Sequence, residues 1–83
     1  MAVRHQTVDE IWFFVSGLGE VWRKLDDSEG VAPVRAGISL NIPVGASFQF
    51  RNTGQEPLDF LVVTIPRWPG PHEAIPVSGR WKR

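Results

Sequence analysis

The sequence predicts a small all-β domain of the sandwich or barrel type, and three observations support this prediction. Apolar and polar residues alternate with a period of two along most of residues 10–65, as they do in half-buried strands. Eight glycines and seven prolines interrupt the 83-residue chain often, which leaves little room for long helices. Short strands at regular spacing, separated by glycine-rich turns, are typical of a β-sandwich or β-barrel.

Six segments carry the strand pattern, in this order along the chain: 10–16, 20–25, 31–37, 38–43, 47–52 and 58–65. Turn-forming residues separate most of them, at 17–19, 26–30, 44–46 and 53–57. The turn at 17–19 joins the first two strands into a hairpin. Pro33 has no N–H to donate to a neighbouring strand, so the third strand is expected at a sheet edge.

The chain changes character after Pro66. Residues 66–81 hold four of the seven prolines and show no clear period. We therefore expect two parts: a barrel core at residues 1–66, and a Pro-rich tail at 67–83 that packs on the barrel surface. Trp68 and Trp81 are expected to hold the tail in place, because large aromatic side chains bury much apolar area.

The composition argues against several classes of protein. Nine basic and nine acidic residues give a formal net charge of zero, whereas nucleic-acid-binding proteins usually carry a basic excess. No apolar run is long enough to span a bilayer, and the first ten residues lack the apolar core of a secretory signal. We therefore expect a cytoplasmic protein with neither nucleic acid nor membrane as a partner. The absence of cysteine rules out disulfides and thiolate metal sites.

Two spaced motifs set this chain apart from a generic β-barrel. The first has His5, Glu10 and Gly17 within HQTVDEIWFFVSGLGEV. The second is GISLNIPVGASFQFRN, whose fixed positions are Gly37, Pro43, Gly45, Phe48 and Asn52. Together they resemble the two motifs of the cupin superfamily, G(X)5HXH(X)3,4E(X)6G and G(X)5PXG(X)2H(X)3N.

The resemblance covers about residues 3–65 and implies a small single-domain cupin, of the kind called a type-2 conserved barrel. The implied fold is a double-stranded β-helix, or jelly-roll barrel. The chain starts almost at the HXH position, so the barrel is expected to be short of its first strands at the N-terminus.

A homodimer is expected from two features. A sheet edge left open at the N-terminus would invite pairing with another chain, and the N-terminal strands could then be exchanged between subunits. In addition, Ile11, Phe13 and Val15 lie on the outward face of their strand and are apolar. Such a face needs cover from a second sheet or a second subunit.

The resemblance also locates the metal ligands of metal-binding cupins, which are three histidines and one glutamate. His5 matches the second histidine of the first motif and Glu10 matches the glutamate. Val3 and Phe48 stand at the other two histidine positions, and the remaining histidine, His72, lies in the tail. A first-row metal in such a site usually takes at least three protein ligands. We therefore expect no metal or other cofactor, with His5 and Glu10 as weak candidate ligands.

Strand parity indicates which side chains share the barrel interior. In an extended segment His5 and Thr7 lie on one face. Glu10 has the opposite parity to His5, so residues 7–9 must bend if both side chains are to point inward. In the cupin register, the cavity would be lined by seven side chains: His5, Thr7, Glu10, Trp12, Phe14, Phe48 and Phe50. An aromatic pocket with a few polar groups is the usual make-up of a small-molecule site.

Three functions are compatible with this pocket. The leading hypothesis is a protein with little or no catalytic activity that binds a small sugar-like or partly apolar ligand. The second is a metal-dependent cupin enzyme, an isomerase or dioxygenase, that uses His5 and Glu10 with further ligands from elsewhere. The third is a structural or interaction module, in which the rings fill the core while His5 and Glu10 hydrogen-bond each other or nearby backbone. The sequence assigns no catalytic residue, and the fold alone does not choose.

Overall fold

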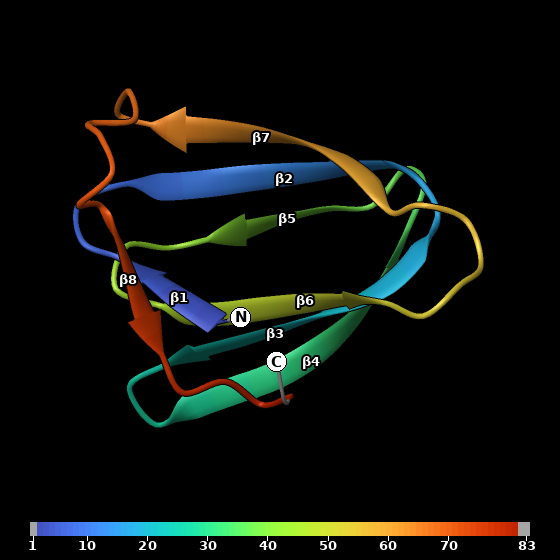
Figure 1. Ribbon diagram of the computed structural model, residues 1–83, viewed down its shortest axis with the longest axis horizontal. Helices are drawn as coiled ribbons and strands as arrows, with labels where there is room; N and C mark the ends of the chain where they lie inside the picture. The colour runs from blue at the N-terminus through green and yellow to red at the C-terminus, as the bar shows by residue number, and fades with distance from the viewer. Residues whose placement is uncertain (1, 82–83) are drawn as a thin grey trace.

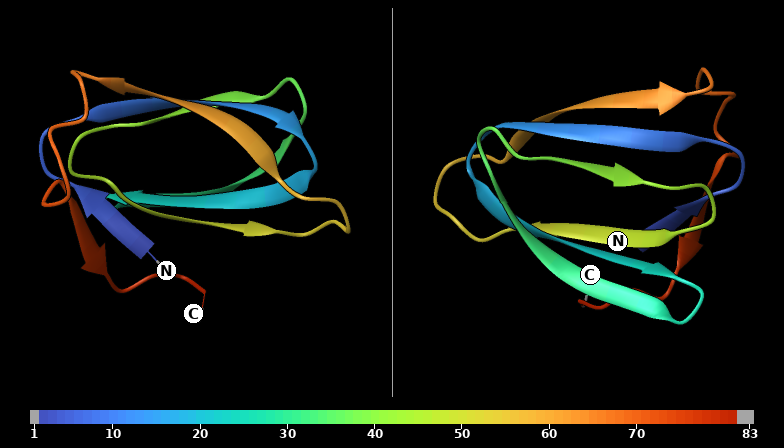
Figure 2. Two further views of the ribbon diagram at one scale, coloured as in Figure 1. Left: turned by 45° about the horizontal axis from the view of Figure 1, so that its top comes forward. Right: turned by 180° about the vertical axis from the view of Figure 1, so that it is seen from behind.

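The computed structural model describes residues 2–81, and within that range the protein is all-β, with eight strands and no helix. The strands are β1 (Ala2–His5), β2 (Asp9–Ser16), β3 (Leu18–Leu25), β4 (Ser28–Arg35), β5 (Ser39–Ile42), β6 (Ser47–Asn52), β7 (Asp59–Ile65) and β8 (Ala74–Val77). They form two antiparallel sheets, of five strands in the order β4-β3-β6-β1-β8 and of three strands in the order β5-β2-β7. The sheets lie against each other as two layers (Figures 1 and 2). The all-β prediction is confirmed.

The first six strands are arranged as nested hairpins. β3 and β4 form the innermost pair, β2 and β5 the next, and β1 and β6 the outermost. Successive pairs alternate between the two sheets. The chain then returns beside β2 as β7, and β8 adds to the other side of β1. In the described part of the chain, β7 has β2 as its one neighbour, so its other edge is free.

Alternation along β2 decides which side chains enter the space between the sheets. Glu10, Trp12 and Phe14 are buried, while Ile11 and Phe13 alternate with them and are exposed. The inner side chains of both sheets meet in one core cluster, which consists of Trp12, Phe14, Val21, Val34, Ile42, Ala46 and Phe48. The core is thus a single layer of large rings and branched side chains between the sheets.

Two predicted turns are shorter than expected, and one predicted edge strand is confirmed. The turn at 17–19 consists of Gly17 alone, with a φ of 90°. The hairpin predicted here is wrong, because β2 and β3 lie in different sheets and the chain crosses from one sheet to the other at Gly17. A Cβ at this position would collide with the carbonyl oxygen of Pro57, so glycine is required. The turn at 26–30 shrinks to two residues, and Asp26 takes its left-handed position with a φ of 54°. Pro33 lies in β4 at the edge of the five-stranded sheet, as predicted.

Two strands fall outside the six that the sequence predicts. β1 is only four residues long, too short for an alternating pattern to be recognised, yet it lies between β6 and β8 in the sheet. β8 forms within the segment expected to be an irregular tail. It contains Pro76, which is tolerated because β8 is an edge strand. Part of the tail therefore belongs to the five-stranded sheet.

Candidate functional site

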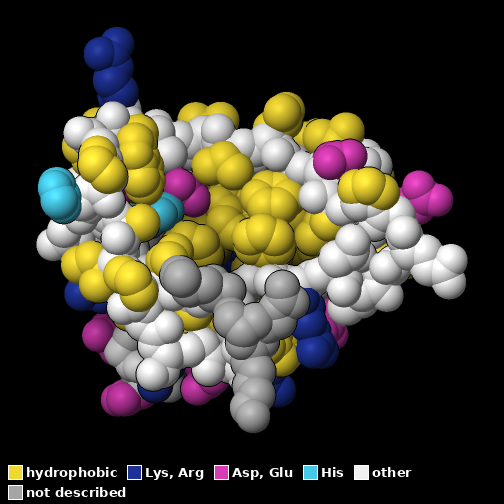
Figure 3. Space-filling view, viewed as in Figure 1, with side chains coloured by type: hydrophobic (Ala, Val, Ile, Leu, Met, Phe, Trp, Pro, Cys, Tyr) yellow, Lys and Arg dark blue, Asp and Glu magenta, His cyan; other side chains and the backbone are white. Residues whose placement is uncertain are grey.

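The space between the two sheets is open on one side. Val62 of β7 pairs with the buried Trp12 and therefore points inward, yet 45% of it is exposed. Phe50 pairs with the buried Val21 in the other sheet, and it is 47% exposed. Figure 3 shows apolar side chains gathered in a hollow between the sheets. The cleft opens beside β7, because no further strand of the described residues pairs with the free edge of β7.

Aromatic rings form the floor of this cleft: Phe50 and Phe60 are partly exposed, and they lie against buried rings of the core. Trp12 lies at the centre, with its ring centroid 5.4 Å from that of Phe48, 5.7 Å from Phe50 and 4.7 Å from Phe60. Trp12 and Phe60 are stacked, while Phe48 and Phe50 meet Trp12 edge to face, and both geometries are favourable. Phe14 is fully buried and packs against Phe60 at 4.8 Å. These contacts join the rings into one packed cluster, which fixes the orientation of each ring.

A polar pair adjoins these rings. His5 is the last residue of β1, Glu10 lies at the start of β2, and the bend between the two strands brings them together. Nδ1 of His5 lies 3.6 Å from Oε2 of Glu10, which is too long for a hydrogen bond. Glu10 instead accepts a hydrogen bond of 2.7 Å from the indole N–H of Trp12 through Oε1. The predicted bend is confirmed, but the direct hydrogen bond considered for this pair is not formed.

The imidazole of His5 is left without a hydrogen bond at one nitrogen. His5 is only 4% exposed, and its buried Nδ1 has no hydrogen-bond partner among the described residues. An unpartnered buried polar atom costs about 1–3 kcal/mol, and native proteins rarely keep one without a reason. An oxygen atom that lay between Nδ1 and Oε2 would accept a hydrogen bond from the first and donate one to the second. The pair is therefore short of one hydrogen-bonding partner.

The tail contributes a ring beside the polar pair. Trp68, expected to hold the tail on the barrel surface, packs its ring against His5 of β1 with centroids 5.1 Å apart. Phe48 packs against His5 at 5.0 Å. Phe60 is also absent from the sequence-based set, although the alternation of Phe60, Val62 and Thr64 along β7 could have indicated it. No sequence signal indicates Trp68, because its direction depends on how the chain turns after β7.

Six of the seven predicted cavity residues adjoin this cluster, namely His5, Glu10, Trp12, Phe14, Phe48 and Phe50. Thr7 is the exception: it is exposed, and its hydroxyl donates a hydrogen bond of 2.6 Å to Oε1 of Glu73. Thr7 lies in the bend between β1 and β2, where the parity of an extended strand no longer applies. The bend turns Thr7 toward the tail instead of the cleft.

Glu73 fixes the bend that positions the polar pair. Its Oε2 accepts hydrogen bonds from the backbone N–H groups of Thr7, at 2.6 Å, and Val8, at 2.8 Å, and it is buried. Burial raises the pKa of the Glu73 carboxyl, but the bonds from the Thr7 hydroxyl and from the two N–H groups outweigh this effect. With a smaller contribution from nearby His5, they hold the pKa below its usual value. A charged carboxylate therefore anchors the tail to the bend.

The residues present do not fit the metal site of metal-binding cupins. Val3 and Phe48 pair directly across β1 and β6, and neither can bind a metal. No group of three or more His, Cys, Asp or Glu side chains converges within residues 2–81. His72 is exposed in the turn before β8. His5 and Glu10 supply two donors, fewer than the three that such a site usually needs.

Comparisons with known proteins add no family assignment. No family model, curated protein or solved structure matched this chain. Among the residues that the structure describes, none form a helix of the length and apolarity needed to cross a membrane. The geometry of the cleft is therefore the basis for a functional conclusion.

Proposed function

We propose that this protein binds a small sugar-like or partly apolar molecule in the aromatic cleft, as a cupin-type jelly roll without a complete metal site. The observation that carries this proposal is the buried Nδ1 of His5, which has no partner and lies 3.6 Å from Oε2 of Glu10. A ligand hydroxyl between these two atoms would accept a hydrogen bond from the N–H of His5 and donate one to Glu10. A hydroxyl-bearing ligand would satisfy the polar atoms and cover the apolar ones.

The strand order supports a jelly roll. Rolling a long hairpin of eight strands pairs the first with the last, the second with the seventh, and so on, with alternate pairs in opposite sheets. The pairs β1·β6, β2·β5 and β3·β4 follow this scheme if β1 is counted as the second strand. β7 is then the eighth strand, and its free edge corresponds to the place of the first. Gly37 and Gly45 of the second motif have φ values of 91° and 86°, as turn glycines would.

The cleft offers two kinds of contact to such a ligand. The buried carboxyl group of Glu10 can accept a hydrogen bond from a ligand hydroxyl, and such a bond to a carboxylate is stronger than one between neutral groups. Phe50 and Val62 present apolar surface that can pack against an aromatic ring or the C–H face of a sugar. Trp12 and Phe60 are already held in place by stacking on each other. Binding therefore costs these side chains little further conformational entropy.

A binding experiment tests this proposal. We expect at least one compound among simple sugars, phenols and aliphatic alcohols to raise the melting temperature and to change the tryptophan fluorescence. Glu10→Gln should weaken that binding at least about tenfold, because loss of a charge-assisted hydrogen bond costs about 1.5–3 kcal/mol. Phe50→Ala should weaken it through lost packing.

Glu56→Gln is the matched control, because the Glu56 side chain is exposed and makes no hydrogen bond in the described structure. It should bind as the wild type does. The proposal fails if no compound of these classes binds below millimolar concentration. It also fails if Glu10→Gln binds as well as Glu56→Gln.

A metal-dependent isomerase or dioxygenase is the second candidate, and the adjacency of His5 and Glu10 favours it. The two-donor set predicts that the purified protein retains no stoichiometric transition metal. Elemental analysis by mass spectrometry measures this, before and after dialysis against each first-row divalent metal. One bound metal ion per chain that is lost in His5→Ala would favour the enzyme instead.

A further inference from the structure

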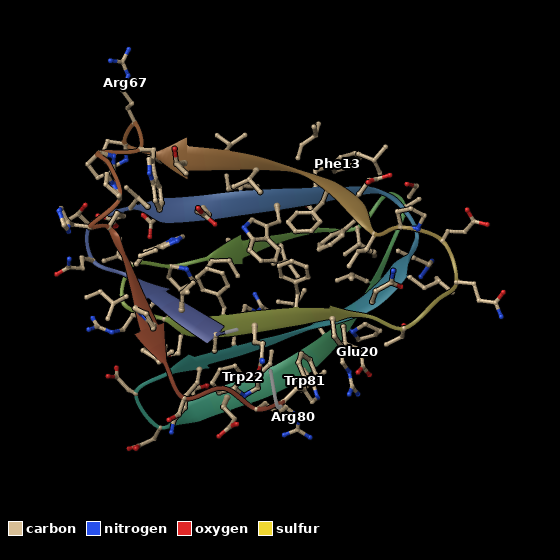
Figure 4. All side chains as sticks on the ribbon, viewed as in Figure 1. Phe13, Glu20, Trp22, Arg67, Arg80 and Trp81 are labelled. Atoms are coloured by element: carbon tan, nitrogen blue, oxygen red, sulfur yellow. The ribbon has the colours of Figure 1, made fainter. Side chains whose placement is uncertain are left out.

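The outer face of the three-stranded sheet is apolar and uncovered by residues 2–81. Ile11 lies opposite Val63, and Phe13 lies opposite Leu61, so these side chains form a cross-strand ladder on one face. We call this surface the outer apolar face, and it consists of Ile11, Phe13, Val15, Leu61, Val63 and Ile65, which are 44–62% exposed. In Figure 4, Phe13 lies on the side of β2 that faces away from β6 and β3.

The outer face of the five-stranded sheet is treated differently, because the tail covers part of it. Trp22 and Gln49 are neighbours on that face, and they are only 4% and 3% exposed. The Gln49 side chain donates to the carbonyl of Trp81 and accepts from its N–H, both at 2.8 Å. A Cβ on Gly79 would collide with Gln49, so the tail lies close against the sheet. Figure 4 shows Trp22 and Trp81 together on this face.

We propose that a second copy of this chain covers the outer apolar face, with the two three-stranded sheets packed face to face about a two-fold axis. The six side chains are each about half exposed, which amounts to roughly 500 Å² of apolar surface. Each partner of a standard interface buries about 800 Å². Ser39 and Asn41 of β5 lie on the same face opposite Phe13 and Ile11, and they extend it with uncharged surface.

The distribution of charge fits a self-complementary contact. Two charged residues occupy paired positions of this face, one at each end: Asp9 lies opposite Ile65, and Asp59 lies opposite Ser16. Arg67 stands at the Asp9 end of β7 (Figure 4). A two-fold axis that runs parallel to the strands, between β2 and β7, places β2 of each copy over β7 of the other. Asp9 of one copy then comes to the end where Arg67 of the other copy stands, and Asp59 comes over the uncharged Ser16, so like charges do not meet. The centre remains apolar and the rim polar, as in stable interfaces.

The molar mass in solution, with charge substitutions on the face, tests this proposal. The wild type should sediment as a dimer over about 1–100 µM, which corresponds to a micromolar or tighter dissociation constant. Phe13→Lys and Leu61→Lys should weaken the dimer at least about tenfold, because an unpaired charge would be buried at its centre. Val31→Lys is the matched control, since Val31 is a similarly exposed valine on the other sheet. It should remain dimeric.

Cross-linking tests the same contact without disrupting it. The chain has no cysteine, so Val63→Cys introduces a single thiol at the middle of the face. A short bis-maleimide should link two copies of this variant, and it should not link Val31→Cys. A wild type that is monomeric at about 100 µM would overturn the proposal. A dimer that persists in both lysine variants would also overturn it, as would equal cross-linking of the two cysteine variants. A monomer that binds phosphatidylcholine vesicles through this face would overturn it as well.

Discussion

Trp12→Ala is expected to remove most of the stability of the protein. Truncating a large buried aromatic side chain costs about 3–5 kcal/mol, and a domain of this size has about 5–10 kcal/mol in all. Trp12 touches Phe48, Phe50 and Phe60, so its loss leaves three rings without their common neighbour. It also removes the indole N–H that Glu10 accepts from. Urea unfolding followed by circular dichroism measures the change.

Two further variants separate the causes. Trp12→Phe keeps a ring but deletes the N–H donor to buried Glu10, and we expect a loss of about 1–3 kcal/mol. Trp81→Ala is the control, because its ring stacks on Arg51 at the surface, a contact worth about 0.5–1 kcal/mol. If Trp12→Ala destabilised the protein no more than Trp81→Ala, the aromatic cluster would not be the core described here.

Glu73→Gln is expected to give the largest loss of stability among single carboxylate changes, and a loss that depends on pH. Glutamine can keep its one oxygen toward the two N–H groups of the bend, but its NH2 group then faces the Thr7 hydroxyl, which can no longer donate to it. The two remaining bonds from N–H groups also lose the strength that a charged acceptor gives them. Because the pKa of Glu73 in the folded protein lies below its usual value, its ionised form stabilises the fold. This contribution is complete above the unfolded pKa and disappears as pH falls through the folded one.

The measurement is the melting temperature from about pH 7 to pH 3, the range over which carboxylates titrate. The difference between wild type and Glu73→Gln should be largest near neutral pH and should shrink on acidification. Asp27→Asn, in the exposed turn between β3 and β4, should follow the wild type at every pH. A difference between wild type and Glu73→Gln that stayed constant with pH would show that the carboxylate charge does not anchor the tail.

Local sequence patterns predicted six of the eight strands, but not β1 and β8, which join the two ends of the described chain. The alternation along residues 10–16 and 47–52 correctly placed Trp12 and Phe48 inward, because in those strands side-chain direction follows from parity alone. β1 and β8 escaped prediction because each has four residues and pairs with the other end of the chain. Their stability comes from partners about 70 residues away, and a local pattern does not report such partners.

The candidate site was predictable to the same extent. Spacing indicated that His5 and Glu10 would approach each other across a bend, and they do. Spacing could not indicate Glu73, since a lone glutamate in a Pro-rich segment looks like any solvated charge. Nor could it show that Thr7 turns toward Glu73 and away from the rings. Side chains in bends and tails are directed by tertiary contacts, and these become visible only in the folded chain.

The pairing of β1 with both β6 and β8 has a consequence for how the protein forms. β1 precedes the other described strands along the chain, yet its partners are near residues 48 and 75. The five-stranded sheet therefore cannot be completed at β1 until both of these distant segments have been made. Sheets closed by such distant contacts fold slowly for their size. During that interval, the unpaired strands of one chain can meet those of another, which makes aggregation between incompletely folded copies a competitor of folding.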